Sequence, residues 1–498
     1  MYIINNNINR KEKLKMEKKS ILTKNISSNI VIKIIYFLTS ILLAIPSIMY
    51  LIKNKTIYNF VYIFSYMCRN PIEQYELYIN AIIYITIFSV LFLLYFKILK
   101  NISKIFKNNK EMFIFIFAIA ALFLIIIPIT SYDVYSYIGN GWVDFKYSEN
   151  PYYTSVQQVW DKNGPDQMLG KVARCWRNEP VIYGPAWSII CKTLTSLSFG
   201  NITAALYIFK FATLIIFVGS LFLIYKITKK KIFVAMFGLN PYILFEFLSN
   251  VHNDIFLVFF VLLSIYFIKN RKNVILSVAC VAIATAIKYL SILLLPFIII
   301  YALKDENIKN KIIKTIIYGL EFLVILCAFY LIYIRDLNVL AGIFIQQNKY
   351  GRSIFLGIYY LLNGDQNILR VAKIIALGIF AISYVTIVFK LFFTNKAKEL
   401  KFSKLMRVYQ IFLFLFTFVL ITNFNAWYVI WLFPTLFFQK AKNIRYTLYL
   451  SVGVIYSYAI SYATKIDNET VGIPYLIVMI CTVIVLSYVR KNNKKVKQ

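Results

Sequence analysis

The stretch MFIFIFAIAALFLIIIPIT (residues 112–130) is followed at once by SYDVYSYIGNGWVDFKYSENPYY (residues 131–153). The first stretch is apolar through residue 129, which is long enough for one helix to cross a hydrocarbon core about 30 Å thick. The second holds two aspartates, a glutamate, six tyrosines and a tryptophan, and is too polar to cross a bilayer. The pair predicts a membrane helix that ends where a polar segment begins at one membrane face.

The same kind of apolar window recurs along the 498 residues, for example at 207–225. Hydrophobic residues make up 60% of the chain and charged residues only 15%, which excludes a soluble protein with several cores. No stretch alternates apolar and polar residues as the strands of an outer-membrane barrel do. We therefore predict an all-α, polytopic transmembrane bundle of about fourteen helices, with a range of eleven to fourteen.

The formal net charge of +34 has a distribution that argues against a nucleic-acid partner. Of the 55 Lys and Arg residues, 37 lie in eight short stretches between or beyond the apolar windows. Cytoplasmic loops of membrane proteins carry such an excess of basic residues. The pattern predicts a multi-pass protein of the cell membrane with both termini in the cytoplasm and no nucleic acid among its partners.

The segments between the apolar windows predict the organisation of the chain. Residues 1–29 and 491–498 are expected to be basic cytoplasmic tails, and 30–490 a single transmembrane domain. Two outer-face segments, 131–200 and 334–366, belong to that domain. The first contains four of the six tryptophans and is expected to include interfacial helices. A tryptophan belt at the interface explains some of these rings without any binding role.

Asp133 is the first candidate for chemistry, because it follows the apolar stretch directly. A carboxylate at the hydrocarbon edge among aromatic rings suits a general base. The alternative is a carboxylate that simply marks a helix end in water. Asp144 and Glu149 lie further along the polar segment and are expected to be solvated or structural.

The stretch NPYILFEFLSNVHND (residues 240–254) is the second candidate, because it contains His252, the single histidine of the chain. Ionisable groups at a membrane edge are costly to bury and are therefore candidates for function. His252, Asn253 and Asp254 could hydrogen-bond a substrate, exchange protons, or only form a turn. One histidine with one aspartate is a weak metal motif, since zinc and iron sites use three or four protein ligands. Glu246 must be paired if it lies at membrane depth.

Three further motifs are expected on the same face. Lys288, in KYLSILLLP, could neutralise a phosphate or extend its ammonium to the interface. Arg352, in QQNKYGRS, could bind a phosphate or carboxylate through its guanidinium, or lie on an ordinary basic loop. The stretch NFNAWYVIWLFP adds Trp427 and Tyr428.

Soluble nucleotide-binding signatures are absent from the chain. There is no Walker motif, no dinucleotide-binding glycine turn, no GxSxG and no HExxH. An enzyme with this sequence is therefore expected to take a substrate delivered by the membrane.

The order of these motifs resembles a known family. D-V-Y-x-Y, E-N-P-Y, Y-G-P-x-W, N-P-Y-x-x-x-E with H-N-D, K-Y-L and W-Y-x-x-W follow one another between residues 131 and 434. This order is similar to that of the GT-C integral-membrane glycosyltransferases, within them the bacterial polyprenyl-phosphate-mannose-dependent alpha-1,6-mannosyltransferase-like group. The resemblance covers about three-fifths of the chain.

The resemblance implies a transferase that moves a hexosyl unit, mannosyl in this group, from a polyprenyl-phosphate-sugar donor to a glycan or glycolipid acceptor at the outer face. Asp133 would be the catalytic base of an inverting displacement, and Lys288 and Arg352 would bind the donor phosphate. No cofactor and no metal are expected. The residues expected to bind sugar or acceptor are Tyr135, Tyr137, Trp142, Tyr183, His252, Asn253, Asp254, Trp427 and Tyr428.

The competing interpretation is a polytopic transporter or a flippase for lipid-linked sugars without transferase activity. Such a protein would use similar intramembrane charges, but they should line a path across the membrane. The polar groups here collect at one predicted face, which favours the enzyme. A scaffold that has lost catalysis would also fit the sequence.

Overall fold

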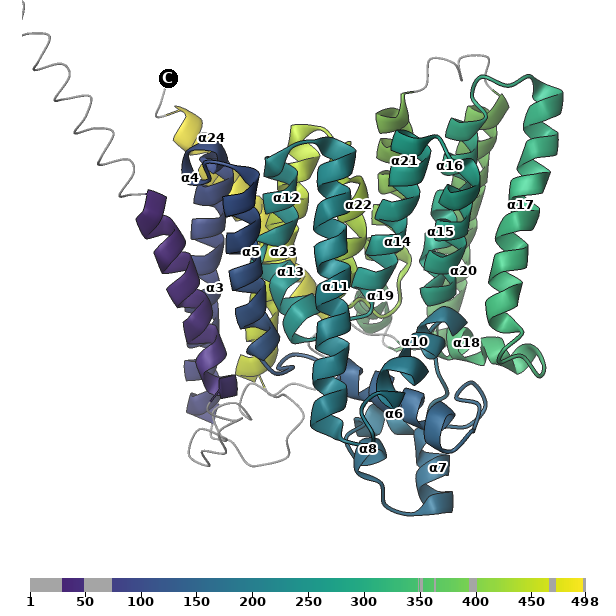
Figure 1. Cartoon of the computed structure of the whole chain (residues 1–498), viewed down its shortest axis with the longest axis horizontal. Helices are drawn as coiled ribbons and strands as arrows, with labels where there is room; N and C mark the ends of the chain where they lie inside the picture. Colours follow the sequence, from purple (N-terminus) through teal and green to yellow (C-terminus); the bar gives the residue numbers. More distant parts are fainter. Residues whose placement is uncertain are drawn as a thin grey trace, which may run out of the picture.

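The computed structural model describes residues 29–48, 74–347, 349, 353–361, 364–393, 401–464 and 472–495. Within these ranges every regular element is a helix, and the long helices run side by side (Figure 1). The predicted all-α polytopic bundle is confirmed. The predicted N-terminal tail lies outside the described residues except for its last residue, whereas the last helix continues into the predicted C-terminal tail.

The longer helices follow one another along the chain with short elements between them. They are Asn29–Ile48, α3 (Gln74–Lys100), α5 (Asn109–Ile125), α6 (Asp133–Lys146), α10 (Pro185–Ser196), α11 (Ile202–Thr228), α14 (Asp254–Tyr266), α15 (Val274–Ile287), α17 (Ile308–Tyr330), α20 (Gln366–Phe393), α21 (Phe402–Leu415), α23 (Ala441–Thr464) and α24 (Gly472–Lys495). The short α-helices are α4 (Ile102–Ile105), α7 (Val156–Asn163), α8 (Gln167–Gly170), α9 (Arg174–Arg177), α12 (Lys231–Gly238), α13 (Pro241–Ile243), α16 (Leu295–Ala302), α18 (Ala341–Gln347), α19 (Ile354–Leu361) and α22 (Phe433–Leu436). The π-helices η1 (Leu244–Ser249), η2 (Phe267–Arg271) and η6 (Phe416–Leu420) and the 3₁₀-helices η3 (Tyr289–Leu294), η4 (Leu337–Leu340) and η7 (Ala426–Leu432) complete the set.

Six helices within the described ranges are long and apolar enough to cross a membrane, and a bent pair can count as a seventh. The bent pair consists of α12 and the Pro241–Ser249 segment, with an angle of 46° between them. Pro241 causes this break because it lacks an N–H for the preceding turn, and the Asn240 side chain caps the new start by accepting a bond from the Tyr242 N–H. Other predicted spans correspond to shorter apolar helices such as α15 and η3 with α16.

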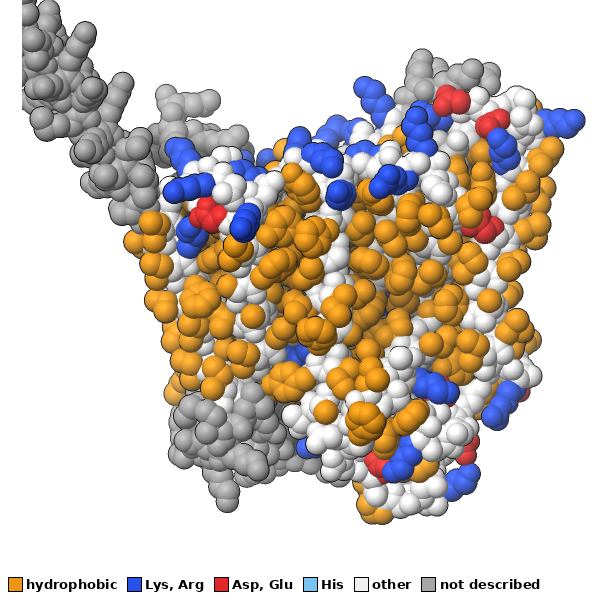
Figure 2. All heavy atoms as spheres, in the orientation of Figure 1, with side chains coloured by type: hydrophobic (Ala, Val, Ile, Leu, Met, Phe, Trp, Pro, Cys, Tyr) orange, Lys and Arg blue, Asp and Glu red, His pale blue; other side chains and the backbone are white. Residues whose placement is uncertain are grey.

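The two ends of the bundle differ in the charged side chains that they carry. Lys and Arg gather at the upper end in Figure 2, above a broad band of hydrophobic side chains. Helices α6, α7, α8 and α10 form a layer at the opposite end. The helices that face outward in the band expose many large apolar residues, for example Ile374 on α20. This arrangement is that of a membrane protein whose polar segment lies at one face.

The two predicted outer segments meet at this lower end, where the Tyr153 hydroxyl donates a bond to the Asp336 carbonyl at 3.0 Å. Just before the second segment, the Tyr333 carbonyl accepts a bond from the Asn150 side chain at 2.6 Å, and the Tyr333 hydroxyl donates one to the Asp144 carboxylate at 2.7 Å. Asp144 also pairs with Lys192 of α10 at 2.7 Å. These contacts tie α6 to α10 and to the chain after α17, so Asp144 has the structural surroundings expected of it.

Candidate functional site

The first candidate residue lies where the chain turns away from α5. Helix α5 ends at Ile125, and an extended linker leads to α6, which begins at Asp133. The Ser131 hydroxyl accepts a bond from the Asp133 N–H at 3.2 Å, and a carboxylate in the first turn is favoured by the helix dipole. The Asp133 side chain is therefore held at the lower end of the bundle by local geometry.

His252 lies between two carboxylates from different elements. Its Nδ1 is 3.6 Å from Asp133 Oδ2, and its Nε2 is 3.3 Å from Glu246 Oε2 of η1. The His252 ring also stacks on Trp427 of η7, with centroids 3.7 Å apart and planes 16° from parallel. Both His252 and Glu246 are fully buried. The array places a buried imidazole between two carboxylates, and neither imidazole nitrogen has a hydrogen-bond partner among the described residues.

The two carboxylates also set the protonation of His252, which lies in the loop between η1 and α14. Burial by itself lowers the pKa of His252, but Asp133 and Glu246 outweigh burial, so the pKa is raised above its ordinary value of 6.5. A raised folded-state pKa means that folding is stabilised at pH values below the unfolded pKa and that this contribution is lost as pH rises through the folded value. The imidazolium therefore stabilises the fold on the acidic side.

We expect the melting temperature of the detergent-solubilised protein to fall as pH rises above 6.5 and through the raised pKa of His252. A His252→Gln variant should be less stable at the acidic end and should lose this dependence on pH. Differential scanning fluorimetry at fixed ionic strength measures both. A wild-type curve with the same slope as the variant would contradict the imidazolium assignment.

A second charged pair lies beside this array. Lys288 Nζ, just beyond the end of α15, donates to Asp254 Oδ1 at 2.7 Å, and the Trp431 indole N–H donates to the same oxygen. The ammonium lies 4.4 Å from the centre of the Tyr428 ring and 5.0 Å from that of Trp431. Tyr428 and Trp431 stack on each other at 4.3 Å. Lys288 is thus a partly exposed cation above two rings, with its counter-ion fully buried beneath it.

The Y-G-P motif approaches this pair because of one glycine. The Gly184 N–H donates to the Ile287 carbonyl at 3.1 Å, and a Cβ at Gly184 would lie only 2.2 Å from the Ala286 carbonyl oxygen. Only glycine allows this close approach of α10 to the end of α15. The approach brings the Tyr183 ring to 6.0 Å from Lys288 Nζ.

Unpaired polar atoms mark the same region. Both side-chain polar atoms of Asn253, together with Asp254 Oδ2 and Glu246 Oε1, are buried without a hydrogen-bond partner among the described residues. Buried polar atoms in folded proteins nearly always form hydrogen bonds, so these atoms are expected to bond to a ligand or a water molecule. They are suited to binding hydroxyl groups.

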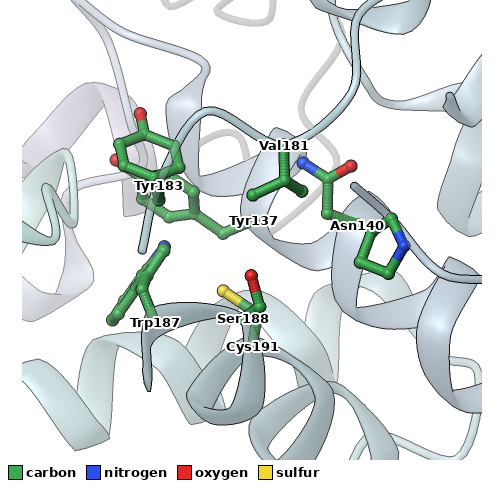
Figure 3. Close-up of a pocket in the computed structure, with 8 residues that line it drawn as sticks. Tyr137, Asn140, Val181, Tyr183, Trp187, Ser188 and Cys191 are labelled. Atoms are coloured by element: carbon green, nitrogen blue, oxygen red, sulfur yellow. The ribbon is translucent and has the colours of Figure 1, made fainter. Parts of the chain in front are cut away.

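A small pocket adjoins the site between α6 and α10. Figure 3 shows Tyr137, Tyr183 and Trp187 on one side of it and Asn140, Ser188 and Cys191 around the rest. Tyr137 packs edge-on against both Tyr183 and Trp187, with centroids 5.4 and 5.0 Å apart. The two tyrosines therefore connect the pocket to the charged residues.

The structure brings most of the predicted site residues together. Contacts connect Asp133, Tyr137, Tyr183, Lys288, His252, Asp254, Trp427 and Tyr428 into one cluster, and Asn253 lies between His252 and Asp254 in the chain. Trp142 lies two and a half helical turns after Asp133, and its indole N–H donates to Asp166 at 3.0 Å. Tyr135 packs on Tyr132. Arg352 lies outside the described residues.

Three residues of the site region were not singled out as binding or catalytic from the sequence. The sequence predicted that Glu246 needs a partner at membrane depth, but it did not identify His252 as that partner. Trp431 could have been found as the last residue of the W-Y-x-x-W motif, one helical turn after Tyr428. Lys210 gave the clearest sequence signal, because its charged side chain interrupts the apolar window 207–225.

Metal binding finds no support among the described residues. No group of three or more His, Cys, Asp or Glu side chains in those ranges is arranged to hold a metal ion. The prediction that no metal is needed stays a prediction.

Comparison with known proteins places the chain in a family. Residues 38–304 match the family model described as "Alpha-(1->6)-mannopyranosyltransferase, N-terminal domain". This range includes Asp133, Glu246, His252 and Lys288, but not the aromatic residues of η7. No solved structure matches the chain significantly.

Two curated relatives share part of the chain. The "Alpha-(1->6)-mannopyranosyltransferase A" of Mycobacterium tuberculosis is 24% identical over 184 residues, which cover 35% of this chain and 34% of that protein. The protein of the same name from Corynebacterium glutamicum is 26% identical over 177 residues, 34% of this chain and 35% of the relative. The matched part thus spans about a third of each relative. Because the family model covers more than half of the chain, the protein belongs to the alpha-(1->6)-mannopyranosyltransferase family.

Proposed function

We propose that this protein is a membrane glycosyltransferase that moves a hexosyl unit, mannosyl by its family, from a polyprenyl-phosphate-sugar donor to a glycan or glycolipid acceptor. The observation that carries the proposal is the Asp133–His252–Glu246 array, which holds one carboxylate at a membrane edge beside a cation and stacked rings. A base, a site for a leaving phosphate and a surface for a sugar ring are the parts that such a transfer requires.

The reaction is assigned to the outer face of the cell membrane, with both termini in the cytoplasm. The assignment rests on the basic side chains, which gather at the end of the bundle opposite to α6 and α10. Cytoplasmic loops carry the excess of Lys and Arg in membrane proteins. The end that carries Asp133 is accordingly the extracytoplasmic one.

Asp133 would act as the base of an inverting displacement. Its carboxylate takes the proton of the acceptor hydroxyl, and the oxygen attacks the anomeric carbon of the donor. The bond from that carbon to the phosphate oxygen breaks on the opposite side, and its electron pair leaves with the polyprenyl phosphate. His252, 3.6 Å away, orients the carboxylate for this step.

Lys288 would stabilise the charge that develops on the leaving phosphate, together with Arg352. The Lys288 ammonium is partly exposed, and after its bond to Asp254 it still has N–H groups free to bind a phosphate. A preorganised cation of this kind contributes about 10²–10³-fold to the rate. The stacked rings of Tyr428 and Trp431 and the unpaired atoms of Asn253 and Asp254 would hold the sugar.

The donor class is the sharpest test of the proposal. Purified protein in lipid nanodiscs is mixed with an acceptor glycolipid and either polyprenyl-phosphate-mannose or a nucleoside-diphosphate-mannose. Mannosylated acceptor should form only with the lipid-phosphate donor. In proteoliposomes, movement of the donor across the bilayer without any product would support the flippase instead and would overturn the proposal.

A further inference from the structure

Lys210 lies in the first third of α11, a helix apolar and long enough to span the membrane. Only 1% of its surface is exposed, and no acidic side chain pairs with it among the described residues. A lysine in this place is costly unless its donors are satisfied. The proposed reaction assigns it no role.

The Lys210 ammonium is satisfied by three backbone carbonyls. Its Nζ donates to the carbonyls of Ile126 at 2.7 Å, Leu248 at 2.9 Å and Ser249 at 2.8 Å. Three acceptors match the three N–H groups of an ammonium, whereas a neutral amine has only two. The acceptors belong to the ends of α5 and η1, where unpaired carbonyls carry partial negative charge. The Lys210 side chain therefore joins two helix ends.

Side chains at the end of η1 strengthen the same junction. The Ser249 hydroxyl donates to the Phe123 carbonyl at 3.1 Å. The Asn250 amide oxygen accepts from the Ile129 N–H at 3.1 Å, and its nitrogen donates to the Thr130 hydroxyl at 2.6 Å. The linker after α5 and the loop after η1 are thus held together at several points around Lys210.

Each of these two segments carries one member of the catalytic array. Asp133 follows Thr130 by three residues, and His252 follows Asn250 by two. The 3.6 Å separation between their side chains therefore depends on how the two segments are joined. Lys210 donates to backbone carbonyls of both segments.

We propose that Lys210 is a positioning residue, whose ammonium clamps the end of α5 to the end of η1 and so sets the distance between Asp133 and His252. The effect on turnover rests on the proposed transferase function. The effect on the His252 environment does not. A displacement of about 1 Å at a reacting group can lower a rate by about 10²-fold, so loss of the clamp should act on turnover rather than on donor binding.

The test compares Lys210→Met with Thr213→Val in full-length protein in nanodiscs. Thr213 is also buried in α11, but its hydroxyl bonds only to the Phe209 carbonyl of its own helix. Lys210→Met should lower kcat by about 10- to 100-fold with the donor KM within about threefold of wild type. The NMR signal of ¹³C-labelled histidine, which His252 alone gives, should move in Lys210→Met and stay in Thr213→Val.

Ser249→Ala is the milder second variant, because it removes one bond of the same junction. It should show the same signature with a smaller fall in kcat, and it serves if Lys210→Met does not fold. A folded Lys210→Met with wild-type kcat and an unmoved histidine signal would overturn the clamp, as would an unchanged Ser249→Ala where Lys210→Met is unfolded. If wild type transfers no sugar, the proposed function fails, and the histidine signal alone decides the clamp.

Discussion

An Asp133→Asn variant is expected to lose about 10²–10⁴-fold in kcat while it keeps its fold and its affinity for the donor. The amide has the shape of the carboxylate but cannot take the acceptor proton. The substitution leaves no cavity, because asparagine and aspartate have nearly the same volume. Initial rates of sugar transfer with purified protein in nanodiscs measure the effect.

Asp144→Asn is the matched control, because Asp144 lies on the same helix and is also buried. Its carboxylate bonds to Lys192 and Tyr333 rather than to the His252 array. We expect this variant to melt at a lower temperature but to keep kcat within a few-fold of wild type. Equal losses of kcat in both variants would mean that Asp133 acts through the fold and not as a base.

A Lys288→Met variant is expected to lose about 3–5 kcal/mol of unfolding free energy, because it leaves a buried carboxylate unpaired. Asp254 is fully buried and would keep only the Trp431 indole N–H as a partner. The same variant should lower turnover by about 10²–10³-fold, since the ammonium is the proposed partner of the leaving phosphate. Denaturant unfolding in detergent and transfer rates measure the two effects separately.

The double variant Lys288→Met with Asp254→Asn separates the two roles. Removing both charges takes away the unpaired carboxylate, so most of the lost stability should return. Turnover should stay low, because the cation is still missing. A double variant with wild-type turnover would exclude Lys288 from phosphate binding. A double variant as unstable as the single one would show that the ion pair is not the source of the stability.

The sequence alone was sufficient for the fold class, and it pointed to most of the residues that the structure brings together in the candidate site. Apolar windows indicate which segments lie in the lipid, and basic stretches indicate which loops face the cytoplasm. Both signals are contained in short stretches of sequence. Asp133, His252 and Lys288 stood out because ionisable residues are rare beside apolar windows. They come together because their helices all end at the same face of the bundle.

Contacts between distant segments could not be predicted in this way. The pairing of Glu246 with His252 depends on the π-helical turn of η1, whose hydrogen-bonding pattern has no sequence signature here. The role of Lys210 depends on two carbonyl-bearing ends from other helices. The Trp142 ring was predicted to bind sugar, but whether its N–H faces a substrate or Asp166 is decided by a residue 24 positions away.

The stereochemistry of a single turnover tests the central claim most directly. Purified protein is given a polyprenyl-phosphate-sugar of known anomeric configuration and an acceptor, and the new linkage is assigned by NMR. One displacement with Asp133 as the base predicts a product of inverted configuration in wild type and almost none in Asp133→Asn. A product that retains the donor configuration, or full transfer by the variant, would contradict the account.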